Sequence, residues 1–162
     1  MIKVFSNFLE KKDFQNIKQN ILDNHNFPWY LSFGISGKED GRQFYHYFYK
    51  DDNTCSNYIK LLEPILNKLQ VNALVRIKLN LLPKSSSILE YKYHTDIIFK
   101  NDVFCKTAIF YLNSNNGHTL FKNFNNIQST ENRLVSFNSN IEHGGTTCTD
   151  QDFRYVLNLN YF

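Results

Sequence analysis

Residues 1–72 carry apolar positions mainly at the spacing of a helix. Between residues 12 and 23, apolar side chains recur three or four positions apart, which predicts an amphipathic helix. Residues 56–69 show the same spacing, but Pro64 lies inside this stretch. Because proline cannot donate the backbone hydrogen bond of a helix interior, we expect either a kinked helix or two short helices, the second opened by Pro64.

Elsewhere the period of the pattern falls to two residues, as in strands. Residues 29–36 and 43–49 are rich in aromatic side chains and could form strands. After residue 72, six segments alternate apolar and polar residues: 73–81, 91–97, 104–112, 118–121, 134–137 and 153–161. Many short strands separated by turns indicate an all-β sandwich or barrel. The two helical stretches would cover the apolar outer face of one sheet.

The polar faces of these strands have two interpretations. In residues 73–81 the odd positions are apolar, whereas Arg76, Lys78 and Asn80 alternate with them. One face of an antiparallel sheet commonly meets water, so these side chains could simply be solvated. If the helices cover the apolar face, the polar face would instead line a barrel interior that holds a charged ligand. Alternation alone leaves both interpretations open.

The composition is that of a folded protein outside the membrane. With 42% hydrophobic residues the chain is too apolar for disorder, and no apolar run reaches the 18 residues that a membrane span needs. Its length predicts a single domain over residues 1–162, with a helical and aromatic part at 1–72 and a β-barrel core at 73–162. The basic residues are scattered rather than gathered in a stripe, so nucleic acid is a possible but not a favoured partner.

The cysteines and the N-terminus bear on the compartment. Cys55, Cys105 and Cys148 form no CxxC pair, which favours free buried thiols in a reducing environment. The N-terminal residues lack the apolar core of a signal peptide. We therefore expect a cytoplasmic protein.

Two residues that can bind a metal stand at strand spacing. His94 and Asp96 lie two positions apart, so on a strand both side chains share a face and can reach one ion. A second histidine would complete the two-His-one-carboxylate face that holds Fe(II) and leaves three positions open. His118 and His143 are the histidines downstream. His143 is the better candidate, because the pair of glycines after it opens a turn.

That turn also suggests a role for Arg154. If the chain reverses near Cys148, His143 and Arg154 come out roughly opposite each other on paired antiparallel strands. A guanidinium beside the metal is suited to binding a carboxylate. A ligand with a metal-chelating head and a distal carboxylate fits this arrangement, and 2-oxoglutarate is such a molecule.

From about residue 73 onward, the chain resembles the iron- and 2-oxoglutarate-dependent dioxygenases. The resemblance is carried by His94-Thr95-Asp96, Tyr111-Leu112-Asn113, Gly117-His118-Thr119-Leu120-Phe121, His143-Gly144-Gly145, and Arg154 eleven residues further on. The order and spacing look most like the prolyl-4-hydroxylase-like branch. The small size and the Asn-, Lys- and Phe-rich composition are similar to the short members that bacteriophages encode, which would place the protein in the host cytoplasm.

The resemblance implies a mainly β fold with flanking helices, the double-stranded β-helix, which is a distorted jelly-roll or cupin-like barrel. It implies that His94, Asp96 and His143 bind Fe(II) at the mouth of this barrel. In related halogenases a small residue replaces the carboxylate, so Asp96 favours hydroxylation.

The same resemblance implies residues for the co-substrate 2-oxoglutarate. Arg154 matches the residue that pairs with its distal carboxylate, and Tyr111 matches a tyrosine that hydrogen-bonds the same group. Asn80 would contact the other end. The branch usually carries a Tyr-x-x-Gly segment upstream of the metal motif, whereas this chain has Leu82-Pro83-Lys84-Ser85.

The implied reaction converts 2-oxoglutarate and O2 to succinate and CO2 while a side chain is hydroxylated, with a prolyl residue of a protein or peptide as the first substrate. The alternatives are oxidation of a nucleobase, nucleotide or small metabolite by the same iron chemistry, and a catalytically idle β-barrel used for binding or structure. A monomer and a homodimer are equally compatible with the sequence. The aromatic segment 29–49 could pack in the core or form a lid over the substrate.

Overall fold

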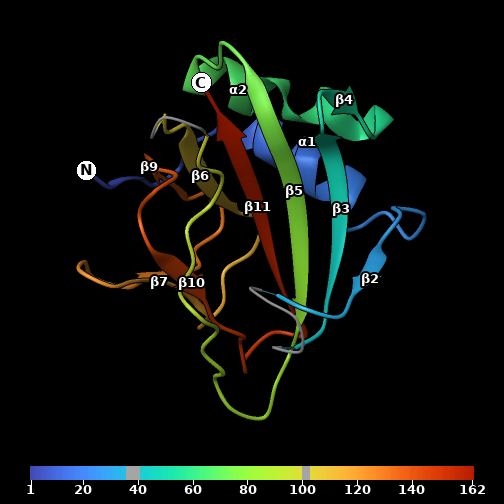
Figure 1. Cartoon of the computed structure of the whole chain (residues 1–162). Helices are drawn as coiled ribbons and strands as arrows, with labels where there is room; N and C mark the ends of the chain where they lie inside the picture. Colours follow the sequence, from blue (N-terminus) through green and yellow to red (C-terminus); the bar gives the residue numbers. More distant parts are fainter. Residues whose placement is uncertain (36–40, 100–102) are drawn as a thin grey trace.

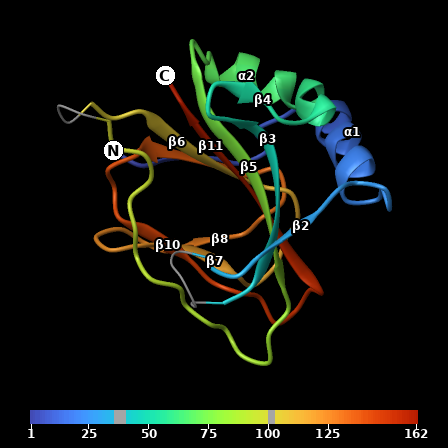
Figure 2. The same ribbon diagram turned by 45° about the vertical axis from the view of Figure 1, so that its right-hand side comes forward.

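The structure is a computed structural model that describes residues 1–35, 41–99 and 103–162. It contains an eight-stranded and a three-stranded antiparallel sheet. The order across the large sheet is β1 (Lys3–Phe5), β9 (Leu134–Asn138), β6 (Lys106–Tyr111), β11 (Phe153–Tyr161), β5 (Leu74–Pro83), β3 (Gln43–Lys50) and β2 (Tyr30–Ser32), with β4 (Asn53–Thr54) paired to β3. The order across the small sheet is β10 (His143–Gly145), β7 (His118–Phe121) and β8 (Ile127–Gln128). The two sheets face each other, and the helices lie on the outer side of the large one (Figures 1 and 2).

The helices form as the period predicted, and the proline divides the second stretch. The first helix is α1 (Lys11–Ile21). A 3-10 helix, η1 (Asn57–Leu62), begins after Ser56, whose hydroxyl accepts a hydrogen bond from the backbone N–H of Tyr58. It is followed at once by α2 (Glu63–Leu69), with Pro64 in the first turn, where its missing N–H costs nothing. The stretch therefore holds two short helices.

The main hydrophobic core lies between these helices and the outer face of the large sheet. Phe14 and Ile17 of α1 and Ile65 of α2 pack there against Leu79 of β5 and Leu157 of β11. A second apolar cluster fills part of the space between the two sheets: Ile109, Tyr111, Phe121, Ile127, Val135, Phe137 and Val156. Because the odd positions of β5 and β11 face the helices, their polar even positions turn inward, towards the small sheet.

The segment that carries His94 and Asp96 is extended but is not the strand that the alternation predicts. It meets its neighbours only at isolated bridges, among them Glu90 with Thr146 and His94 with His143. The backbone N–H of Tyr91 donates to the carbonyl oxygen of Gly145, and that of His94 donates to the carbonyl oxygen of His143. The two donors lie three residues apart, whereas the two acceptors lie two residues apart. This mismatch prevents a regular ladder.

The hairpin predicted to place His143 opposite Arg154 is wrong. Gly144 and Gly145 are not a turn but part of β10, which pairs with β7. Arg154 lies in β11 opposite Leu82 of β5. Residues 146–152 connect the small sheet to the large one, so the two residues approach each other across the barrel and not along a ladder.

The remaining expectations concern single features. Cys105 and Cys148 are buried as expected, whereas Cys55 is exposed. Residues 43–49 lie in β3, and the 29–36 segment contributes β2, although residue 36 falls outside the described part of the chain. In the described part, no helix is long and apolar enough to span a bilayer.

Candidate functional site

Three side chains with metal-binding atoms converge between the two sheets. His94 and Asp96 come from the extended segment before β6, and His143 is the first residue of β10. One ligand atom from each residue lies within 4.8 Å of the others. Nε2 of His143 is 3.9 Å from Oδ2 of Asp96, and the two imidazole centroids are 4.7 Å apart. Two backbone hydrogen bonds of 2.9 Å between His94 and His143 hold the rings side by side.

The tautomers of both imidazoles suit metal binding. Nδ1 of His143 lies 3.0 Å from the carbonyl oxygen of Ile141, and Nδ1 of His94 lies 3.3 Å from that of Lys92. A carbonyl only accepts, so each Nδ1 carries the proton and each Nε2 keeps its lone pair. Burial lowers the pKa of His143 below its usual value, which keeps this imidazole neutral. His143 is thus in the form that a metal cation needs.

The carboxylate of Asp96 is held on both oxygens. Arg76 donates to Oδ1 over 3.0 Å, whereas Thr107 and Asn160 donate to Oδ2 over 2.6 and 3.0 Å. Burial alone would raise the pKa of Asp96, but the neighbouring His143 and Arg76 act in the opposite direction. With the hydrogen bonds of Thr107 and Asn160 they hold the pKa below its usual value, so the carboxylate is ionised. Two imidazoles and one carboxylate could hold a divalent metal ion such as Fe(II).

A cavity of about 340 Å³ opens beside this triad. Its wall includes polar residues at even-numbered positions of β5 and β11. The alternation alone left open whether these side chains meet water or line a barrel interior. Five such residues line it: Arg76, Lys78, Asn80, Arg154 and Asn158. These polar faces therefore line a barrel interior.

Arg154 presents an unmatched positive charge to the cavity. Its side chain is only 3% exposed, and its Nε donates to Oγ of Ser129 over 2.8 Å. Its Nη2 has no hydrogen-bond partner among the described residues. Burial lowers the pKa of Arg154, yet a guanidinium stays protonated in proteins. A buried cation without a counter-ion is costly, so the geometry calls for an anionic ligand.

Tyr111 and Asn80 lie beside this cation in different ways. The guanidinium of Arg154 lies 5.8 Å from the ring centroid of Tyr111. Burial raises the pKa of Tyr111, and its neutral hydroxyl donates to Oγ1 of Thr119 over 2.7 Å. Thr119 lines the cavity and Tyr111 lies behind it. Oδ1 of Asn80 and Oδ1 of Asn158 are buried in the cavity wall without a partner in the described part of the chain.

Sequence reasoning missed the residues that hold these groups in place. Thr107, Ser129 and Asn160 contact Asp96 or Arg154. Gly117 leaves room for the Arg154 side chain, because a Cβ there would lie 2.7 Å from Cδ of Arg154 and 2.8 Å from the carbonyl oxygen of Thr147. The inward faces of β6 and β11 contain Thr107 and Asn160, whereas no pattern marks Ser129.

Replacing Gly117 with alanine should weaken 2-oxoglutarate binding by about tenfold, because the new methyl group meets a backbone carbonyl and pushes Arg154 from its position. Isothermal titration measures the effect. Gly145→Ala is the matched control, since its Cβ would lie 3.7 Å from Nη1 of Arg154, an ordinary contact. A wild-type affinity in Gly117→Ala would show that this crowding is harmless.

Replacing Thr107 with valine should lower the affinity for Mn(II), a redox-stable substitute for Fe(II), by about 10- to 100-fold. The variant keeps the shape of the side chain but removes the hydrogen bond that orients Oδ2 of Asp96. Anaerobic calorimetry checks it, with Thr130→Val as a control outside the cavity wall. Unchanged affinity in Thr107→Val would mean that Asp96 needs no such support.

No protein-family model and no curated protein matches this sequence. Solved structures match over nearly the whole chain. One match is a prolyl hydroxylase from Trichoplax adhaerens, in complex with a hypoxia inducible factor peptide fragment. It has a TM-score of 0.67 at 19% identity, and the match covers 99% of this chain and 83% of the hydroxylase chain. The viral collagen prolyl hydroxylase from Paramecium Bursaria Chlorella virus-1 has a TM-score of 0.66 at 11% identity, with 98% and 94% covered. A 2OG-Fe(II) oxygenase family oxidoreductase from Burkholderia pseudomallei has a TM-score of 0.69 at 10% identity, with 99% and 84% covered.

The chain has the 2-oxoglutarate oxygenase fold. The double-stranded β-helix predicted from the sequence is thereby confirmed, and so is the resemblance to the prolyl-hydroxylase-like branch at the level of fold. Within this oxygenase fold, the triad and Arg154 line one cavity between the sheets. Identities of 10–19% establish the architecture and leave the reaction to be argued from the site.

Proposed function

We propose that this protein is an Fe(II)- and 2-oxoglutarate-dependent dioxygenase that hydroxylates a side chain, with a prolyl residue of a protein or peptide as the favoured substrate. One observation carries the proposal: a two-His-one-carboxylate triad and a buried, unmatched guanidinium line the same cavity. Three protein ligands on one face leave positions for a chelating keto acid and O2.

The buried polar atoms of the cavity fit this co-substrate. Arg154 is the counter-ion for the distal carboxylate of 2-oxoglutarate, and Ser129 and Tyr111 keep its guanidinium in place. Thr119, whose Oγ1 accepts the Tyr111 hydrogen bond, keeps its own O–H to donate towards the ligand. Asn80 also lines the cavity, and its amide nitrogen would donate to the other end of the molecule.

The metal ligands define the reacting end of the cavity. Iron, when bound by His94, Asp96 and His143, would supply the activation of O2. One oxygen atom enters succinate as 2-oxoglutarate loses CO2, and the other replaces a C–H bond of the prime substrate by C–OH. The residues of the chain keep His143 neutral, keep Asp96 ionised and fix the orientation of the co-substrate.

The preference for a prolyl substrate rests on the fold neighbours. One is a prolyl hydroxylase in complex with a peptide, and another is a viral collagen prolyl hydroxylase. The matches extend over 83% and 94% of those two chains.

The test is succinate formation from 2-oxoglutarate by protein reconstituted anaerobically with Fe(II) and then exposed to O2. We expect slow turnover without substrate, faster turnover with prolyl peptides, and the gain of one oxygen atom by the peptide in mass spectrometry. His94→Ala should show none of these. If the folded wild-type protein neither turns over nor binds 2-oxoglutarate, it is an idle barrel. Stimulation by a nucleotide instead of a peptide would reassign the substrate.

A further inference from the structure

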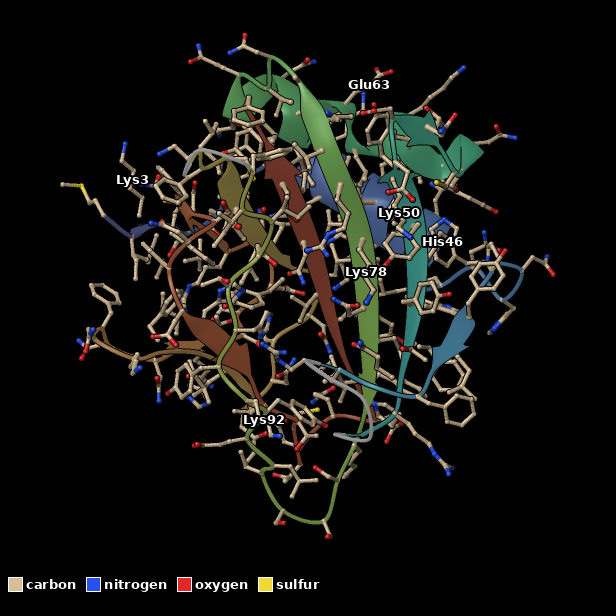
Figure 3. The ribbon with its side chains drawn as sticks, in the orientation of Figure 1. Lys3, His46, Lys50, Glu63, Lys78 and Lys92 are labelled. Carbon is tan, nitrogen blue, oxygen red and sulfur yellow. The ribbon has the colours of Figure 1, made fainter. Side chains whose placement is uncertain are left out.

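Lys78 is the third cation of the cavity wall, with Arg76 and Arg154, and no carboxylate of the described residues forms an ion pair with it. It lies on β5, half-buried, and lines the same cavity as the metal triad. Its Nζ is 5.2 Å from the ring centroid of Tyr45 and 5.7 Å from that of Tyr47, both on the neighbouring strand β3. Figure 3 shows Lys78 on β5 beside Lys50 on β3. Among the described residues Lys78 has no ion pair.

The two other cations of the cavity, Arg76 and Arg154, each have an anionic partner, observed for Arg76 and proposed for Arg154. Arg76 is paired with Asp96 at 3.0 Å. In the proposed function, Arg154 takes the distal carboxylate of 2-oxoglutarate, and the metal ion takes the carboxylate at the keto end. Both negative charges of the co-substrate are then used, and Lys78 is left over.

The surroundings of Lys78 make an unpaired ammonium unfavourable. Burial, together with the charges of Arg76 and Lys50, lowers the pKa of Lys78 to about 8. An anion beside it would offset the burial and keep the proton in place. The two tyrosine rings hold the ammonium by cation–π contact without neutralising it. Lys78 therefore has the features of a binding site for an anionic group.

The position of Lys78 separates it from the co-substrate anchor. Along β5, Arg154 lies opposite Leu82, and Lys78 lies four residues further, opposite Asn158. Four residues of a strand span about 13 Å. Lys78 is therefore well separated from Arg154 and lies two residues from Arg76, whose partner is the metal-binding Asp96, so it is near the reacting end.

We infer that Lys78 binds a carboxylate of the prime substrate, so that the preferred substrate is acidic close to the carbon that is oxidised. The carboxylate could belong to a Glu or Asp next to the target prolyl residue, or to a small free acid. This inference rests on the proposed function, and it adds the charge of the substrate to it.

The experiment compares how strongly three probes stimulate succinate formation: acetyl-Glu-Pro-amide, the neutral acetyl-Gln-Pro-amide, and N-acetylproline with its free carboxylate. With the wild-type protein we expect at least one acidic probe to stimulate about tenfold more than the neutral one, the effect of a partly buried ion pair. The acidic dipeptide and the free acid distinguish the two sources of the carboxylate.

Variants of Lys78 then test the residue itself. Lys78→Arg should keep the preference, Lys78→Met should lose it, and Lys78→Glu should shift it towards acetyl-Lys-Pro-amide. Lys50→Met is the matched control, since Lys50 lies 5.3 Å from the same Tyr47 ring but is exposed and outside the cavity. Its preference for the acidic probes should equal or exceed that of the wild type, because removing the charge of Lys50 favours the protonated form of Lys78. Calorimetry of 2-oxoglutarate on each variant accompanies the assay, and the charge-conserving and charge-reversing variants keep the test valid if Lys78→Met folds poorly.

Two results would overturn the inference while the proposed function stands. The first is wild-type turnover that ignores the charge of the probe. The second is a tenfold loss of 2-oxoglutarate affinity in Lys78→Met and Lys78→Glu, which would assign Lys78 to the co-substrate. Absence of any turnover by the wild-type protein would instead remove the proposed function, and this inference with it.

Discussion

Replacing His143 with alanine should abolish succinate formation and lower the affinity for Fe(II) or Mn(II) at least about 100-fold, because one of three protein ligands is lost. The fold should survive. The bridge between His94 and His143 is made by backbone atoms, which the substitution keeps. The lost ring contacts, to Phe137 at 4.8 Å and Phe121 at 6.3 Å, cost roughly 1–3 kcal/mol. Anaerobic calorimetry measures the metal, and circular dichroism monitors the fold.

His118→Ala is the matched control for this prediction. His118 is the other histidine that the sequence analysis considered as a metal ligand. It lies half-buried on β7, outside the group of three metal-binding side chains. Its backbone N–H donates to Oγ1 of Thr146, a bond that alanine retains. Normal metal affinity is expected in this variant. If His118→Ala lost the metal and His143→Ala kept it, the ligand set would be wrong.

The residues of β5 and β11 that share a face could be predicted from the sequence, because polar and apolar residues alternate over most of each strand. Ile77 and Leu79 pack under the helices, whereas Lys78 and Asn80 face the cavity. Period two reports which side chains share a face. It cannot report which strand lies next to which, since pairing depends on segments far apart in the chain. For this reason the prediction of a hairpin between His143 and Arg154 was wrong, although both residues reach one cavity.

The chemistry of the site was visible in residues that are rare and reactive. A histidine two positions from an aspartate, and an arginine at an inward position, carry information because few other functions need them. Thr107, Ser129 and Asn160 hold those residues in place with neutral hydroxyl and amide groups. The chain has 22 asparagines, so nothing marks Asn160 before the fold brings it to Asp96.

The role of the aromatic segment 29–49 could not be predicted from the sequence alone either. His46 and Phe48 are buried, with Phe48 in the core under the helices, whereas Tyr45 and Tyr47 of the same strand lie against Lys78. One strand thus serves both packing and cavity wall, since its residues alternate between two faces. Residues 36–40 of this segment lie outside the described part of the chain.

Replacing Arg154 with alanine should raise the Kd for 2-oxoglutarate about 30-fold or more, because the distal carboxylate then enters a buried site without its counter-ion. Metal affinity should stay near the wild-type value, which separates this variant from His143→Ala. Arg133→Ala is the control, since Arg133 is half-buried and outside the cavity wall.

Thermal unfolding adds a second readout to the Arg154 variant. In the wild-type protein, 2-oxoglutarate at about 100 times its Kd should stabilise the fold by about 2.7 kcal/mol, and Arg154→Ala should lose most of this gain. Without ligand the variant should be about as stable as the wild type, because the substitution removes a buried charge that no described residue neutralises. Arg154→Lys should fall between the two, since the ammonium keeps the charge but cannot form the two-pronged contact of a guanidinium. A wild-type rise in Tm with 2-oxoglutarate that persists in Arg154→Ala would place the distal carboxylate elsewhere, because no ligand can stabilise a fold through a contact that it does not make.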